Sequence, residues 1–276
     1  MMRLMVGVLF CLLPLFAMAD AFGGRPVTLT DGRTDPAAAP LIVALHGAGG
    51  TAANMQRKTG FDAIAARHQL VIAYPNVERR RWRDGRDSDD ATDVAYLAAL
   101  IEMLIADGRA DPARVYLVGH SNGGGMAMRM ACDRPDLIAG IAVVSTNLLT
   151  AYPCEGGTSV PAIFFHGSAD PITPAQGRAE DHRFGGAYSV ARTLEVWATR
   201  NRCRQPTLLQ SLDAVDDGTT VDLIRYAGCR APLVHVQIDG HGHGWPGTRL
   251  RPLRLLGPAT REVDAAPLIW WFFDKM

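Results

Sequence analysis

The chain has 276 residues, of which 48% are hydrophobic, and this is enough to bury the core of a globular protein. Its 28 basic residues are balanced by 28 acidic ones, so the sequence carries no overall positive field that would attract nucleic acid or an anionic membrane. These values exclude a disordered chain and favour a small or neutral partner.

The first segment, residues 1–19, is typical of a secretory signal peptide. Arg3 precedes an apolar stretch that is too short to span a bilayer comfortably and that ends in small residues. We expect cleavage between Ala19 and Asp20. The mature chain, residues 20–276, is then secreted or periplasmic and has no stable association with a membrane.

The mature chain shows no internal repeat, low-complexity stretch or long linker, so we expect a single domain. Short apolar runs rich in branched residues predict strands that are buried on both faces. These runs span residues 41–47, 70–75, 114–120, 138–145, 162–167 and 233–240. Helical patterns separate them, the clearest at 90–107, and this alternation predicts an α/β fold with a mostly parallel central sheet flanked by helices. Residues 219–229 depart from the pattern and predict an extra strand.

Four cysteines follow the signal peptide, and their even number in an exported chain predicts two disulfides. The sequence leaves three pairings open. Pairing Cys132 with Cys154 and Cys203 with Cys229 closes the shortest loops.

The segment GHSNGG, residues 119–124, lies where a predicted strand ends and a helical pattern begins. It contains the pattern Gly-x-Ser-x-Gly, with Ser121 at its centre. In open α/β sheets, ligands bind at the carboxyl ends of the strands. Because a Ser between two glycines in this context is typical of a nucleophile elbow, we predict that Ser121 is a catalytic nucleophile.

A serine hydroxyl needs a His to accept its proton and a carboxylate to orient that His. The Gly-rich segment DGHGHGWPG follows the last predicted strand, so we expect the base to be His241 or His243. Asp170 comes just after the strand at 162–167 and is the expected acid, with Asp239 as its rival. Two His residues two positions apart are also a possible metal pair, but no third ligand is evident, and we expect no metal or organic cofactor.

An acyl-transfer site also needs backbone amides that stabilise the oxyanion of its intermediate. One is expected at Asn122, directly after the nucleophile. The segment LHGAGGT supplies the other, and we expect it at Ala48, with Gly49 as second choice.

Two tryptophans are candidates for contact with substrate. Trp245 lies beside the expected base, where packing of the loop explains it equally well. Trp82 lies in the charged segment ERRRWRDGRDSDD, where a lone aromatic suggests contact with a flat or apolar substrate.

Several sequence segments, taken in order along the chain, together resemble the motifs of a known family. Among them are PLIVALHGAGGTAANM, DPARVYLVGHSNGGGMAMRMAC, PAIFFHGSADPITP and DGHGHGWPG. Over residues 41–275 the chain resembles the secreted polyhydroxybutyrate depolymerase and feruloyl esterase group of α/β-hydrolases. In that group the His of the Gly-His-x-Trp-Pro-Gly block is catalytic, which selects His243, and the Asp of the His-Gly-x-x-Asp block is the acid, which matches Asp170. The group's cysteine positions agree with the short-loop pairing. Many relatives have Cys where this chain has Ala48.

The resemblance implies an α/β-hydrolase fold and a serine carboxylic ester hydrolase that works through an acyl-enzyme without a cofactor. It implies short 3-hydroxyacyl esters, soluble oligomers or aromatic esters as substrates. A secreted acyltransferase with the same triad and a non-catalytic hydrolase-like binding protein are the alternatives.

Overall fold

The computed structural model describes residues 18–276 apart from 87–89, 183, 249 and 251–252. Most of the expected signal peptide, residues 1–17, therefore lies outside the described residues. The described chain begins in a strand, β1 (Met18–Phe22), that pairs with β2 (Arg25–Asp31).

The described strands form one sheet in the order β1-β2-β4-β3-β5-β6-β7-β10-β9-β8. Its middle consists of six strands joined by parallel pairings. These are β4 (Val71–Pro75), β3 (Ala39–Leu45), β5 (Ala110–His120), β6 (Gly140–Val144), β7 (Ala162–Gly167) and β10 (Leu233–Asp239). The two edges are antiparallel, with β1 and β2 on one side and β9 (Thr220–Tyr226) and β8 (Pro206–Leu212) on the other.

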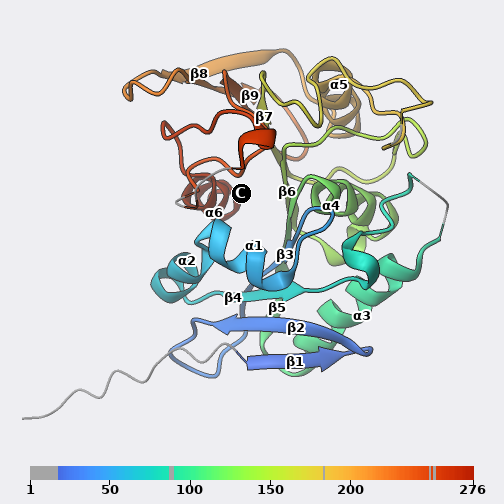
Figure 1. Ribbon diagram of the computed structural model, residues 1–276. Helices are drawn as coiled ribbons and strands as arrows, with labels where there is room; N and C mark the ends of the chain where they lie inside the picture. Colours follow the sequence, from blue (N-terminus) through green and yellow to red (C-terminus); the bar gives the residue numbers. More distant parts are fainter. Residues whose placement is uncertain (1–17, 87–89, 183, 249, 251–252) are drawn as a thin grey trace, which may run out of the picture.

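Helices cover both faces of this sheet (Figure 1). One face packs against α3 (Thr92–Ala106), α4 (Asn122–Asp133) and α5 (Val190–Arg200). The other face packs against α1 (Ala52–Thr59), α2 (Phe61–His68) and α6 (Ala265–Asp274). Within the described residues, none of the helices has the length and apolar character needed to cross a bilayer.

The central strands are apolar along their whole length because both of their faces are buried. In β3, Leu41 and Val43 pack into the core beneath α3 to α5, whereas Ile42 packs into the core on the opposite face. Successive side chains of a strand point to opposite faces, so a strand covered on both sides needs apolar residues at every position. The prediction of a mostly parallel sheet flanked by helices is confirmed.

The predicted elements correspond closely to the observed ones. Each of the six predicted apolar runs overlaps a strand of the parallel block, the helix expected at 90–107 is α3, and the extra strand expected at 219–229 is β9. The sequence analysis missed β1, β2 and β8. The last of these is an edge strand whose residues are exposed or only partly buried, so it lacks the apolar run that reveals a central strand.

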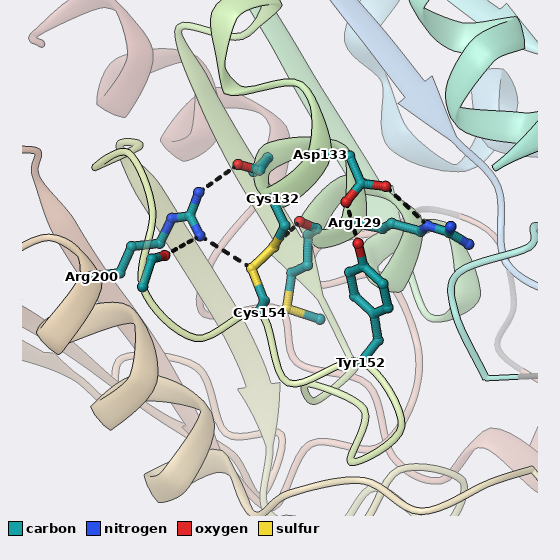
Figure 2. Close-up of a disulfide and its surroundings, with 9 residues drawn as sticks. Arg129, Cys132, Asp133, Tyr152, Cys154 and Arg200 are labelled. Atoms are coloured by element: carbon teal, nitrogen blue, oxygen red, sulfur yellow. Dashed lines mark hydrogen bonds and ion pairs between the residues drawn. A yellow bond between two sulfur atoms is a disulfide. The ribbon is translucent and has the colours of Figure 1, made fainter. Parts of the chain in front are cut away.

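The cysteines form the pairs that close the shortest loops, Cys132 with Cys154 and Cys203 with Cys229. The first disulfide ties the last turn of α4 to the segment that follows β6, and Arg200 from α5 reaches across to it (Figure 2). The Arg200 guanidinium donates to the carbonyl oxygens of Gly156 at 2.6 Å and Ala131 at 2.7 Å. These bonds join α5 to both halves of the cross-link.

Candidate active site

Ser121 lies at the tight turn between β5 and α4. Its backbone has φ 55° and ψ −123°, a strained conformation for a residue that carries a side chain. Glycines make this turn possible: a Cβ on Gly119 would lie 2.1 Å from the carbonyl oxygen of Gly123, and one on Gly123 would lie 2.3 Å from that of Leu45. The Ser121 amide donates to the Val144 carbonyl at 2.8 Å, so the turn is anchored to the neighbouring strand β6.

The structure brings Ser121 together with the two residues expected to support it. The Nε2 of His243 lies 2.9 Å from the Oγ of Ser121, and its Nδ1 lies 2.7 Å from an Asp170 carboxylate oxygen. A carboxylate only accepts hydrogen bonds, so Nδ1 carries the proton and Nε2 is free to accept one from the serine. Thus three residues from the turns after β5, β7 and β10 form one line of hydrogen bonds.

Asp170 is held ionised although it is buried. Burial raises the pKa of this carboxyl, but hydrogen bonding and charge from His243, together with bonds from the Thr173 amide and hydroxyl, outweigh it and hold the pKa below the usual value. The Thr173 hydroxyl donates at 2.7 Å, and the amides of Ile172 and Thr173 each donate at 2.8 Å. A negative, fully bonded carboxylate can orient the His243 ring and stabilise its protonated form.

The rival residues lie elsewhere and have other partners. Asp239 accepts a hydrogen bond from the Ser168 hydroxyl at 2.6 Å. His241 is fully buried, its Nδ1 accepts from the Thr260 amide at 3.0 Å, and its Nε2 lies 3.1 Å from the Gly244 carbonyl oxygen. Both ring nitrogens of His241 are thus engaged by the backbone, and this residue supports the loop that carries His243.

The two residues expected to supply oxyanion amides, Asn122 and Ala48, lie next to Ser121 and in the loop that approaches it. Asn122 is the first residue of α4, where amides have no acceptor within the helix. Ala48 is exposed, and in the described part of the chain nothing accepts from its amide. The amide of Gly49, the alternative oxyanion donor, already donates to the Arg80 carbonyl at 2.7 Å. A Cβ on Gly47 would lie 3.3 Å from that of Ser121, which shows how closely this loop approaches the turn.

The side chain of Asn122 has a role that the sequence analysis missed. It accepts from the Trp82 amide at 2.7 Å, and it donates to the Trp82 carbonyl at 3.0 Å and to the Asp84 carboxylate at 2.8 Å. Asp84 in turn pairs with Arg86. Asn122 therefore fastens the segment after β4 to the start of α4 through its side chain, while its amide stays available.

The prediction that Trp82 and Trp245 offer surface to substrate is not supported, because the structure buries both side chains, at 1% and 2% exposure. Trp82 donates from Nε1 to the His46 carbonyl at 2.9 Å and so supports the loop before Ala48. Trp245 packs edge-on against Phe61. Near Trp82, Arg83 pairs with Asp90 and Arg86 pairs with Asp84.

Two further polar residues lie behind His243. The Nε2 of His120 lies 2.8 Å from the His243 carbonyl oxygen, and the Nζ of Lys58 lies 3.0 Å from the Nδ1 of His120. No local pattern identified them, since Lys58 is 62 positions before His120 in the chain. Across the described ranges, no group of three or more His, Cys, Asp or Glu side chains is arranged to hold a metal ion.

The chain is similar to several known esterases. The chain is 30% identical over 255 residues to "Putative esterase NocK" of Nocardia uniformis subsp. tsuyamanensis, covering 84% of this chain and 73% of that protein. It is 27% identical to feruloyl esterase C of Emericella nidulans, covering 77% and 74% of the two chains. The structure of an acetyl xylan esterase from Aspergillus awamori matches the fold with a TM-score of 0.59 at 14% identity, covering 90% of this chain and 93% of that one.

The fold and these relatives define the class of this protein: it is a carboxylic ester hydrolase with the α/β-hydrolase fold. Residues 32–171 match the model of the esterase PHB depolymerase family. The chain belongs to this family, in agreement with the resemblance that its motifs carry.

Proposed function

We propose that this protein is a serine esterase in which Ser121, His243 and Asp170 form the catalytic triad. The observation that carries the proposal is the unbroken line of hydrogen bonds, 2.9 Å from Ser121 to His243 and 2.7 Å from His243 to Asp170. The strained φ of Ser121 supports it, because such strain has a cost in stability that a catalytic role explains. The buried Asp170, whose pKa is held below the usual value, also supports it, because its negative charge would stabilise a protonated His243.

In this mechanism the Ser121 Oγ attacks the ester carbonyl carbon while its proton moves to the Nε2 of His243. The negative charge that develops on the carbonyl oxygen is stabilised by the amides of Ala48 and Asn122. Collapse of the tetrahedral intermediate breaks the bond to the alcohol, which takes the proton from His243 and leaves an acyl-Ser121 ester. A water molecule then attacks this ester, again with His243 as base, and releases the acid.

The substrates that we propose are short 3-hydroxyacyl esters, their soluble oligomers and aromatic esters. The family is described by polyhydroxybutyrate depolymerase activity, and one relative is named a feruloyl esterase. Ser121 is partly exposed and Ala48 is exposed, so an ester that is part of a larger molecule has access to the nucleophile from solvent.

We also propose that the protein is exported and cut before Asp20. The apolar segment at residues 1–19 and the two disulfides support this. Such a cut would leave Asp20–Phe22 paired with β2. Mass spectrometry of the protein recovered from the periplasm or culture medium checks the site, and a mature chain that starts at residue 1 would contradict it.

The triad is tested by hydrolysis of p-nitrophenyl butyrate, methyl ferulate and soluble 3-hydroxybutyrate oligomers. We expect Ser121→Ala and His243→Ala each to lower kcat by roughly 10⁴-fold or more. Asp170→Asn should lower it by at least 10²-fold, whereas Asp239→Asn, the same change at the rival carboxylate, should leave it within about twofold.

Ser168→Ala is the matched control for the nucleophile, because Ser168 is an exposed serine whose hydroxyl bonds to Asp239 and to the Gly240 amide at the end of β10. Wild-type turnover in folded Ser121→Ala or His243→Ala would refute the triad. Product that forms only when an acceptor alcohol is added would identify an acyltransferase instead.

A further inference from the structure

The polar contacts behind the proposed base begin at Lys58. This lysine lies near the end of α1, is partly buried, and points its Nζ at the Nδ1 of His120 at 3.0 Å. Across the described residues no carboxylate lies within ion-pair distance of its Nζ. Burial lowers the pKa of Lys58 to about 7. Burying an amine without a carboxylate partner costs stability, so we expect its hydrogen bond to another polar group, here His120, to have a role.

His120 transmits this contact toward the active site. Burial, and then the charge of Lys58, hold the pKa of its ring well below the usual value, so the ring is neutral and carries one N–H. Its Nε2 faces the His243 carbonyl oxygen at 2.8 Å, and because a carbonyl only accepts, the proton lies on Nε2. Its Nδ1 must then accept, and Lys58 is the donor.

His120 also lies next to Ser121, to the ring of His243 and to the loop that carries Ala48. It directly precedes Ser121, and its ring lies 5.2 Å from the ring of His243 between centroids. A Cβ on Gly47 would lie 3.1 Å from its Nδ1, so the loop that carries Ala48 passes closely over it. A shift of this ring would disturb the nucleophile turn, the oxyanion loop and the backbone of the base.

We propose that Lys58 is a positioning residue of the esterase reaction, which holds His120 in the tautomer that donates to the His243 carbonyl and so fixes the backbone from which His243 reaches Ser121. The proposal rests on the triad proposed above. Lys58 acts through His120 and does not touch the reacting atoms.

Other titratable groups face the same region. On the side of the oxyanion loop lies His46. Burial holds the pKa of its ring below the usual value, and the positive charges of Lys58 and Arg80 lower it further. On the side of the base, His241 and His166 interact with His243 and Asp170, and burial lowers the pKa of both rings. Each of these rings therefore favours its neutral form, and Lys58 is the cation whose Nζ contacts His120.

The experiment compares four proteins in the same ester assay: wild type, Lys58→Met, Lys58→Arg and Lys275→Met. Methionine keeps most of the volume of lysine but cannot donate, whereas arginine keeps a donor. Lys275 is the only other lysine of the chain, and it pairs with Asp274 at the end of α6, so its substitution is a matched control for the loss of one positive charge.

We expect Lys58→Met to lower kcat about tenfold while KM changes less than twofold, because the lost hydrogen bond affects the alignment of the base and not the binding of the ester. Lys58→Arg should recover kcat to within about threefold of wild type, and Lys275→Met should be indistinguishable from it. Unfolding in urea at the same pH separates a kinetic loss from a loss of fold.

Nitrogen-15 NMR of labelled histidines gives a second readout, assigned with His120→Gln. We expect wild-type His120 to carry its proton on Nε2, and this preference to weaken in Lys58→Met. A proton on Nδ1 in the wild type would overturn the proposal without any Lys58 variant, as would an unchanged kcat in folded Lys58→Met. Ser121→Ala in the same series separates the two proposals: if it keeps its turnover the triad is wrong, and if it is inactive while Lys58→Met is fully active, only the role of Lys58 is wrong.

Discussion

Replacing His235 with leucine should make the stability of this protein less sensitive to acid. His235 lies in the middle of β10, between β7 and β9, and is 5% exposed. Its Nε2 has no hydrogen-bond partner in the described part of the chain. Burial, and to a smaller extent the electrostatic interaction with His166, lower the pKa of His235 from 6.5 to about 4. The folded protein therefore holds this ring neutral.

The sign and size of the effect follow from proton binding. Below pH 6.5 the unfolded chain takes up a proton on His235 that the folded chain refuses, so stability is lost as pH falls from about 6.5 to about 4. A shift of this size corresponds to roughly 3 kcal/mol in full and to about 2 kcal/mol at pH 5, since each pKa unit is worth about 1.4 kcal/mol.

Urea unfolding at pH 8 and pH 5 measures this difference. We expect the loss of unfolding free energy between the two pH values to be about 2 kcal/mol smaller in His235→Leu than in wild type. His182→Leu, the same change at an exposed histidine, should keep the wild-type difference. If His235→Leu and wild type lose the same amount, the buried neutral state of this ring is wrong.

Two further predictions concern the framework of the site. Removing the disulfide with Cys132→Ala and Cys154→Ala together should lower the unfolding free energy by about 3 kcal/mol, because the cross-link spans 22 positions; an unchanged urea midpoint would contradict this. Gly123→Ala should abolish ester hydrolysis and reduce the soluble yield, because its Cβ would lie 2.3 Å from the Leu45 carbonyl oxygen. In Gly244→Ala the nearest atom would be 3.9 Å away, so this control should fold, and equal behaviour of the two variants would refute the steric argument.

The fold was predictable from sequence where burial is complete. Each strand of the parallel block is apolar on both faces, and such a run is visible without any knowledge of its neighbours. The edge strand β8 was missed for the opposite reason: its side chains are largely exposed, and only its hydrogen bonds to β9 make it a strand. The pairing partner, and not the composition of the segment, decides its structure.

The candidate site was predictable where one local motif defines a backbone shape. The turn at Ser121 needs glycine at positions 119 and 123 for steric reasons, and these positions are close enough in the sequence to form a recognisable motif. The choice between His241 and His243 was different, because both lie in the same Gly-rich loop and only the family resemblance separated them. In the structure their surroundings differ, since backbone groups engage both nitrogens of His241 and only His243 faces Ser121.

By itself, the sequence determined where the buried strands lie along the chain and the glycine turn at Ser121, because each depends on neighbours in the chain. Only the tertiary structure decided that Trp82 is buried and that Lys58 reaches His120. Both depend on contacts between segments 36 to 62 positions apart, where the energy comes from burial and hydrogen bonding between partners that no local pattern reveals.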